Sequence, residues 1–200
     1  MMKWTLVGLS RLVSGARARW VGCEPHSRQR IYFANHTSHL DTLVLWAALP
    51  PSLRPLTRPV AARDYWGASA PRRFLAESIF NAVLIDRVLA GGVANPVTEM
   101  LQALGDRHSL IIFPEGTRSP TGEPGAFKSG LYHLARERSD VELVPVFMEN
   151  LNRILPKGSF LPVPLLGGVT IGAPIRLDAD EQKVDFLARA RDAVLGLRSL

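Results

Sequence analysis

The amino-acid sequence predicts an α/β fold, a single-domain αβα sandwich with a mostly parallel central sheet, preceded by a short amphipathic N-terminal helix. Short apolar runs with the length of buried strands alternate with segments of helical spacing, the pattern of a parallel sheet covered by helices. The 200 residues are 46% apolar, which is enough for one hydrophobic core. A single cysteine, Cys23, excludes an intramolecular disulfide framework. We therefore divide the chain into an interface segment, residues 1–20, and one domain, residues 21–200.

Residues 1–20 mix apolar side chains with Lys3 and three arginines. This pattern is compatible with an amphipathic helix in a membrane interface, and equally with a surface helix packed on the domain. The segment is too short and too charged to span a bilayer. Residues 1–80 contain 11 Lys and Arg against 4 Asp and Glu, a net charge of +7. Such a field favours an anionic membrane surface, whereas nucleic acid is not expected because no binding motif is recognisable.

The first domain strand, residues 31–34, runs into a polar turn. Apolar spacing from Ser38 onward predicts a helix with Thr37 or Ser38 as its N-cap, which puts His36 at the turn and Asp41 in the first helical turn. A carboxylate there can bind one ring nitrogen of His36, fix its tautomer and leave the other to accept a proton from a substrate hydroxyl. The pair predicts a catalytic dyad without an enzyme nucleophile.

Other interpretations of this turn stay open. A His and an Asp at this spacing also occur by chance. Asp41 can serve only to favour the positive end of the helix dipole, with His36 as a hydrogen-bonded turn residue. His36, His39 and Asp41 can also supply metal ligands, but no further His, Cys or Asp cluster completes a set, so we expect no metal.

Prolines and glycines delimit the elements that follow, because proline interrupts regular structure and glycine ends helices. In order along the chain, we expect a strand at 56–62 broken by Pro59, short helices within 64–75, a strand at 82–85, a helix at 96–104, a strand at 109–113, a helix at 127–138, a strand at 143–148, a strand at 168–172 and a helix at 184–197.

A second polar turn follows the strand at 109–113, at residues 114–119. The carboxyl ends of parallel strands share one edge of a sheet, where ligands of α/β proteins bind. We therefore expect His36, Arg87 and the turn residues Glu115 to Arg118 to line one cleft. Lys128 lies near the N-terminus of the next helix, where a bound phosphate is favoured.

Two stretches, N-H-T-S-H-L-D at 35–41 and F-P-E-G-T-R-S at 113–119, resemble the first and third motifs of the glycerolipid acyltransferase family, which includes the lysophosphatidic acid acyltransferases. Residues 82–87 are similar to the second motif and residues 144–146 to the fourth, and all four occur in family order. Asn81 stands where the second motif usually opens with glycine, a departure that concerns the local backbone.

The resemblance implies an O-acyltransferase that moves a fatty acyl group directly from a thioester, acyl-CoA or acyl-carrier protein, to the hydroxyl of a lysophospholipid. The commonest acceptor is 1-acyl-sn-glycerol-3-phosphate, which gives phosphatidic acid. His36 and Asp41 would form the general base, and no cofactor is expected beyond the co-substrate. The substrate-binding residues would be Arg87, Glu115, Gly116, Thr117, Arg118 and Lys128.

Within that set, a planar guanidinium suits a dianionic phosphate, so Arg118 and Arg87 are the expected clamps, with Lys128 as a point charge. Glu115 would orient Arg118 or bind the glycerol hydroxyl. Residues 144–146 either wall the acyl pocket or form a buried edge strand.

Several functions remain compatible with these residues. The acceptor can be another lyso-lipid, and a thioester hydrolase would use the same histidine with water as the acceptor. A non-catalytic lipid-binding protein is a third class. For the acyltransferase, we expect a peripheral or monotopic position on the cytoplasmic face of a membrane.

Overall fold

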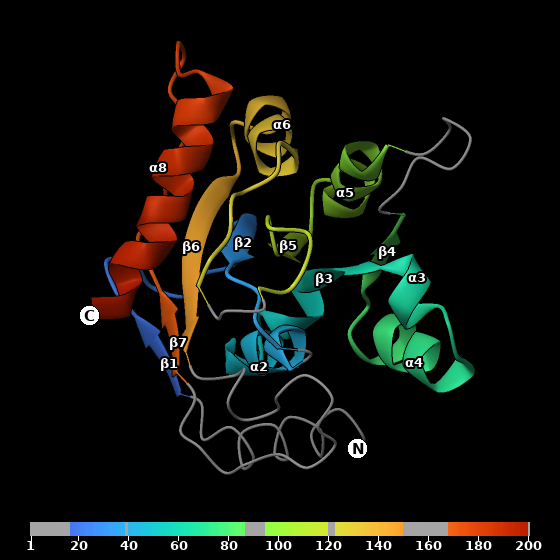
Figure 1. Cartoon of the computed structure of the whole chain (residues 1–200). Helices are drawn as coiled ribbons and strands as arrows, with labels where there is room; N and C mark the ends of the chain where they lie inside the picture. The colour runs from blue at the N-terminus through green and yellow to red at the C-terminus, as the bar shows by residue number, and fades with distance from the viewer. Residues whose placement is uncertain (1–16, 39, 87–94, 120–122, 150–167, 200) are drawn as a thin grey trace.

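The computed structural model describes residues 17–38, 40–86, 95–119, 123–149 and 168–199. Its centre is a seven-stranded sheet in the order β1-β7-β6-β2-β5-β3-β4 (Figure 1). The strands are β1 (Arg17–Trp20), β2 (Arg30–Ala34), β3 (Thr57–Ala62), β4 (Val83–Ile85), β5 (Ser109–Ile112), β6 (Glu142–Glu149) and β7 (Gly168–Ile171). The five strands from β6 to β4 run parallel to one another. β7 and β1 are parallel to each other and run in the opposite direction. The mostly parallel sheet is confirmed.

Helices cover both faces of the sheet, which confirms the αβα sandwich. In Figure 1, α2 lies on one face and α5, α6 and α8 on the other. The helices are α2 (Asp41–Ala48), α3 (Arg63–Trp66), α4 (Ala70–Phe74), α5 (Pro96–Leu104), α6 (Gly130–Glu137) and α8 (Lys183–Gly196), with the helical turns η1 (Arg54–Leu56), η2 (Leu75–Ile79) and η3 (Leu197–Ser199). Among the described residues, no helix has the length and apolarity needed to cross a membrane.

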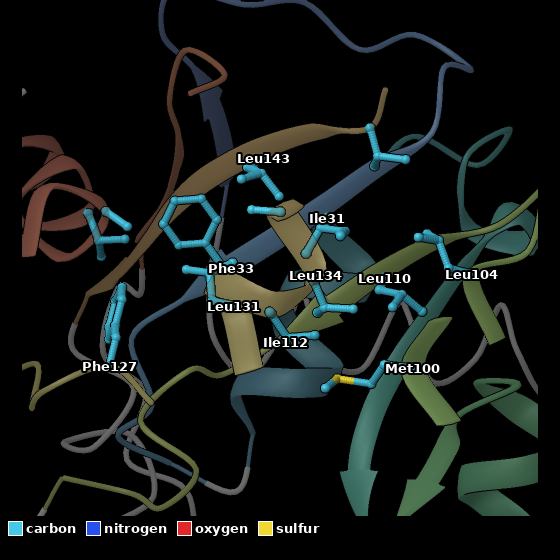
Figure 2. Close-up of a cluster of buried hydrophobic side chains, with 14 of the residues drawn as sticks. Ile31, Phe33, Met100, Leu104, Leu110, Ile112, Phe127, Leu131, Leu134 and Leu143 are labelled. Carbon is cyan, nitrogen blue, oxygen red and sulfur yellow. The ribbon is translucent and has the colours of Figure 1, made fainter. Parts of the chain in front are cut away.

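Strand β2 connects the two hydrophobic cores. Alternate side chains of a strand point to opposite faces, so Tyr32 and Ala34 pack in the core beneath α2. Ile31 and Phe33 pack instead with α5, α6 and α8, in the cluster drawn in Figure 2. All residues of β2 are buried. Burial on both faces explains why this strand reads as a continuous apolar run.

The first twenty residues differ from the prediction where the structure describes them. Residues 17–20 form β1, which pairs with β7 at the edge of the sheet, so the N-terminal helix does not extend through them. The register puts Trp20 opposite Ile171, so strand pairing outweighs the helical spacing there. Residues 1–16 lie outside the described residues, as do His39, Arg87 and the Pro/Gly-rich segment 150–167.

Three further expectations differ from the structure. β3 runs without a break through Pro59. β4 pairs only with residues 60–62 of β3, so the N–H that Pro59 lacks interrupts no pairing with β4. α6 begins at Gly130 rather than near residue 127. β6 is an interior strand between β2 and β7, and Val144 and Val146 pack in the core beneath α2, so residues 144–146 are not an edge strand, and they do not line the cavity described below.

Asn81 takes the backbone conformation that glycine prefers. Its φ is +51°, and it is the only described residue other than glycine with a positive φ. Asparagine tolerates this left-handed region better than most other non-glycine residues, so Asn81 fits the turn before β4.

We expect Asn81→Ala to lower the free energy of unfolding by about 1 kcal/mol, because alanine is strained at this φ. Asn81→Gly should change it by less than half of that. Urea unfolding of both variants measures the difference. An equal loss in both would assign the effect to lost side-chain contacts instead.

Candidate active site

The turn between β2 and α2 is folded around the carboxylate of Asp41. This side chain is fully buried, and its Oδ2 accepts hydrogen bonds from His36 Nδ1 at 2.8 Å, Thr37 N at 2.6 Å and Ser38 N at 2.8 Å. A carboxylate only accepts, so Nδ1 carries the imidazole hydrogen and Nε2 is left as the basic nitrogen. The hydrogen bond predicted between His36 and Asp41 is confirmed.

The predicted N-cap is wrong. α2 begins at Asp41, and neither Thr37 nor Ser38 caps it with a side chain. The reason is local: the backbone N–H groups of Thr37 and Ser38 point at the Asp41 carboxylate, so this short stretch forms a turn of its own before the helix. Asp41 is the first helical residue, within the predicted first turn.

Asn35 anchors this turn to the sheet. Its side-chain amide donates to Met148 O at 2.9 Å and its Oδ1 accepts from Met148 N at 2.7 Å. The backbone pairing of β2 with β6 ends at Ala34, and the Asn35 side chain extends it by one residue through these two bonds. Sequence reasoning assigned Asn35 no role, although its position next to His36 was a usable signal.

Glu115 joins the first turn to the second. The residue is 6% exposed; its Oε1 accepts from the backbone N–H of His36 at 2.8 Å, and its Oε2 accepts from that of Gly125 at 3.0 Å. A further backbone bond runs from Ser119 N to His36 O at 2.8 Å. Glu115 therefore holds the histidine backbone rather than a neighbouring arginine.

The His36 ring lies at the edge of a large cavity. Its side chain is 20% exposed, and the ring stacks on Phe113 with centroids 4.3 Å apart and planes at 22°. The cavity measures about 930 Å³ and is lined by residues at or just past the carboxyl ends of β2, β3 and β5. Sequence reasoning assigned Phe113 no role of its own, although it is the first residue of the polar stretch at 113–119, directly after β5.

Gly116 and Lys128 are in close contact at the second turn. Gly116 has a φ of +69°, and a Cβ at this position would lie 2.7 Å from Lys128 Nζ and 3.0 Å from its Cε. Any larger residue would be strained and would displace the lysine. Lys128 N also donates to Pro114 O at 2.9 Å, so this cation is held beside the turn.

The other predicted binding residues differ in whether they line the cavity. Arg118 lines the cavity with His36, Gly116 and Lys128, is half-buried, and makes no hydrogen bond or ion pair with a described residue. Thr117 is exposed and does not line the cavity.

Comparisons with known proteins decide the family. The profile of the family described as Acyltransferase matches residues 21–149. This chain belongs to the acyltransferase family.

Among relatives, human 1-acyl-sn-glycerol-3-phosphate acyltransferase alpha is 33% identical over 128 residues, 63% of this chain and 42% of that protein. The 1-acyl-sn-glycerol-3-phosphate acyltransferase of Limnanthes douglasii is 30% identical over 164 residues, 79% of this chain and 55% of that protein. The chain thus spans about half the length of these relatives.

The crystal structure of the 1-acyl-sn-glycerophosphate acyltransferase PlsC from Thermotoga maritima has the same fold, with a TM-score of 0.74 and 19% sequence identity. The match covers 98% of this chain and 80% of that one. The acyltransferase fold therefore extends beyond the segment that the family profile matches.

The cavity of this member of the family has polar and apolar parts. Cationic side chains lie near the two turns, while an apolar wall comes from β3, β4, α5 and α6. That wall is made by Val60, Ile85, Val97, Met100, Leu101 and Leu131. No three His, Cys, Asp or Glu side chains among the described residues lie together as a metal site, and His39 falls outside them.

Proposed function

We propose that this chain transfers a fatty acyl group from a thioester donor, acyl-CoA or acyl-carrier protein, to the hydroxyl of 1-acyl-sn-glycerol-3-phosphate, giving phosphatidic acid. Family membership and the names of the relatives support acyl transfer to this acceptor. One observation carries the chemistry: the His36 ring, bound to the buried Asp41 carboxylate, lines the same cavity as Arg118 and Lys128.

In the proposed mechanism, His36 is the general base. Nε2 takes the proton of the acceptor hydroxyl while that oxygen attacks the thioester carbonyl carbon, and Asp41 stabilises the imidazolium that forms. The tetrahedral intermediate then loses its C–S bond, and the released thiolate takes up a proton. A thiol is a good leaving group, so little acid assistance is needed. No metal or other cofactor takes part in this scheme.

Oxyanion stabilisation falls to groups of the second turn. The N–H groups of Thr37 and Ser38 donate to Asp41 and that of Gly116 donates to Phe113 O, so these are already used. Within the described residues, no acceptor binds the N–H groups of Thr117 and Arg118. Preorganised N–H groups are suitable donors for a developing oxyanion.

Acceptor phosphate would be held by Arg118 and Lys128. A guanidinium binds phosphate with two parallel hydrogen bonds, and an ammonium adds a second charge. Arg87, outside the described residues, is retained as a second clamp. We assign Glu115 to positioning His36, since both its carboxylate oxygens already accept backbone hydrogen bonds.

The apolar wall of the cavity is suited to the acyl chain, because burying methylene groups there is favourable. Both acceptor and product are membrane lipids. We therefore propose a peripheral or monotopic position on the cytoplasmic face of an anionic membrane.

For the acceptor site, we expect Arg118→Lys to raise the acceptor KM about tenfold, the loss of one charge-assisted hydrogen bond, with a smaller change in kcat. Initial rates at varied acceptor concentration measure both constants. Arg136→Lys is the matched control, since Arg136 lines the same cavity but pairs with Glu137 at 3.2 Å. An unchanged acceptor KM in Arg118→Lys would argue against the clamp.

The function is tested by thiol release from a long-chain acyl-CoA, and from acyl-carrier protein, with and without 1-acyl-sn-glycerol-3-phosphate. Release that requires the acceptor and yields phosphatidic acid supports the proposal. Release without acceptor would identify a hydrolase. Acceptor-dependent release with another lysophospholipid alone would keep acyl transfer and change the acceptor.

A further inference from the structure

One corner of the molecule projects into solvent. All seven residues from Ala68 to Phe74 are exposed, a run that includes the whole of α4. Phe74 is 51% exposed, and among the described residues Val184, at 73%, is the one other large hydrophobic side chain that is exposed. We call residues 68–74 the α4 corner. An aromatic side chain at the end of a projecting segment has no core of its own to enter.

Two arginines that pair with no described acid directly precede Phe74 in the chain. Arg72 and Arg73 are exposed, and neither guanidinium hydrogen-bonds or ion-pairs with a described residue; Arg72 lies over the Tyr65 ring, 4.6 Å from its centroid. Arg63 is different, because it bonds Leu84 O at 2.5 Å and Asp86 at 3.3 Å. The next acid along the segment is Glu77, in η2.

The α4 corner adjoins the candidate active site. Tyr65, whose ring contacts the Arg72 guanidinium, lines the cavity together with Trp66 and His36. Figure 1 shows α3 and α4 together beyond the β4 edge of the sheet, whereas α8, with Val184 in its first turn, lies towards the opposite edge. A surface that binds the α4 corner would therefore face the cavity.

We propose that the α4 corner docks on anionic phospholipid, with Arg72 and Arg73 on headgroup phosphates and Phe74 inserted among the first methylenes. Arginine beside an exposed aromatic residue is the combination that membrane interfaces favour. The purpose rests on the proposed function, because a lipid acceptor must reach the cavity from a membrane. A protein partner typically buries about 800 Å² on each side, whereas the α4 corner is a single run of seven residues.

A local fluorescence probe tests this contact. In a Cys23→Ser background, whose hydroxyl can keep the bond that Cys23 makes to Gly172 O, Phe74→Cys and Val184→Cys are each labelled with a polarity-sensitive fluorophore. Vesicles of phosphatidylcholine mixed with phosphatidylglycerol should shift the emission at position 74 to the blue and raise it several-fold. The same vesicles should leave position 184 unchanged, and pure phosphatidylcholine should give little signal at either position.

Charge removal supplies the second test. In the full chain, Arg72→Gln combined with Arg73→Gln should weaken co-sedimentation with the anionic vesicles about 10- to 30-fold, while Val184→Ala should not. No shift at position 74, or equal shifts at both positions, overturns the proposal. A shift with acyl-carrier protein and none with vesicles overturns it in favour of a protein partner. Neither test needs turnover, so an inactive acyltransferase would still give an answer.

Discussion

His36→Ala should lower the kcat of acyl transfer by about 10²- to 10⁴-fold, the usual contribution of a positioned general base. The fold should survive, because the ring is partly exposed and Asp41 keeps the backbone donors Thr37 and Ser38. Single-turnover rates with saturating acceptor and donor measure the effect, and urea unfolding checks the fold.

His133→Ala is the matched control. His133 lines the same cavity, yet no carboxylate among the described residues binds it, so we expect less than a tenfold change in kcat. Comparable losses in the two variants would show that the cavity merely needs imidazole bulk, and would remove His36 from the role of base.

Two substitutions of Asp41 separate its effect on catalysis from its effect on folding. Asp41→Asn keeps an oxygen acceptor but removes the charge that stabilises an imidazolium, so kcat should fall while the protein stays folded. Asp41→Ala should also lose stability, because His36, Thr37 and Ser38 lose a common buried acceptor.

Glu115→Ala should lower the free energy of unfolding by about 2 to 5 kcal/mol, because the N–H groups of His36 and Gly125 both lose a buried acceptor. kcat should fall with it, since the backbone that carries the base is no longer held against the second turn. Gly125 also packs closely against Glu115, because a Cβ at position 125 would lie 3.2 Å from Glu115 Oε2.

Glu115→Gln should give a smaller loss, because the amide oxygen satisfies one of the two N–H groups and its NH₂ faces the other. Glu137→Gln is the control carboxylate, exposed and paired with Arg136 on the cavity wall. A rise in acceptor KM with unchanged unfolding in Glu115→Ala would mean that Glu115 touches the substrate and does not position the turn.

Much of the fold was predictable because its strands are buried on both faces. The apolar runs at β2, β5 and β6 left little ambiguity, and α8 was expected within a residue of its observed bounds. Prediction failed where local preference met tertiary context. Residues 17–20 have helical spacing but pair with β7, and Pro59 lies inside a strand because of where β4 begins.

The candidate site likewise contains contacts that the sequence predicts and contacts that it does not predict. His36 and Asp41 are five residues apart, so a turn and the start of a helix are enough to bring them together. The contacts of Glu115 with His36 and of Asn35 with Met148 join residues 79 and 113 positions apart. Such pairs depend on strand order, which no local pattern contains.

By itself, the sequence determined the alternation of strands and helices, the His36–Asp41 pair and the two polar turns, because these follow from periodicity and short spacing. Only the tertiary structure decided that Glu115 binds backbone rather than arginine, that Lys128 lies against Gly116, and that Arg72, Arg73 and Phe74 are exposed. The physical reason is that burial and hydrogen-bond partners are set by neighbours distant in the chain, and the order of strands in the sheet chooses those neighbours.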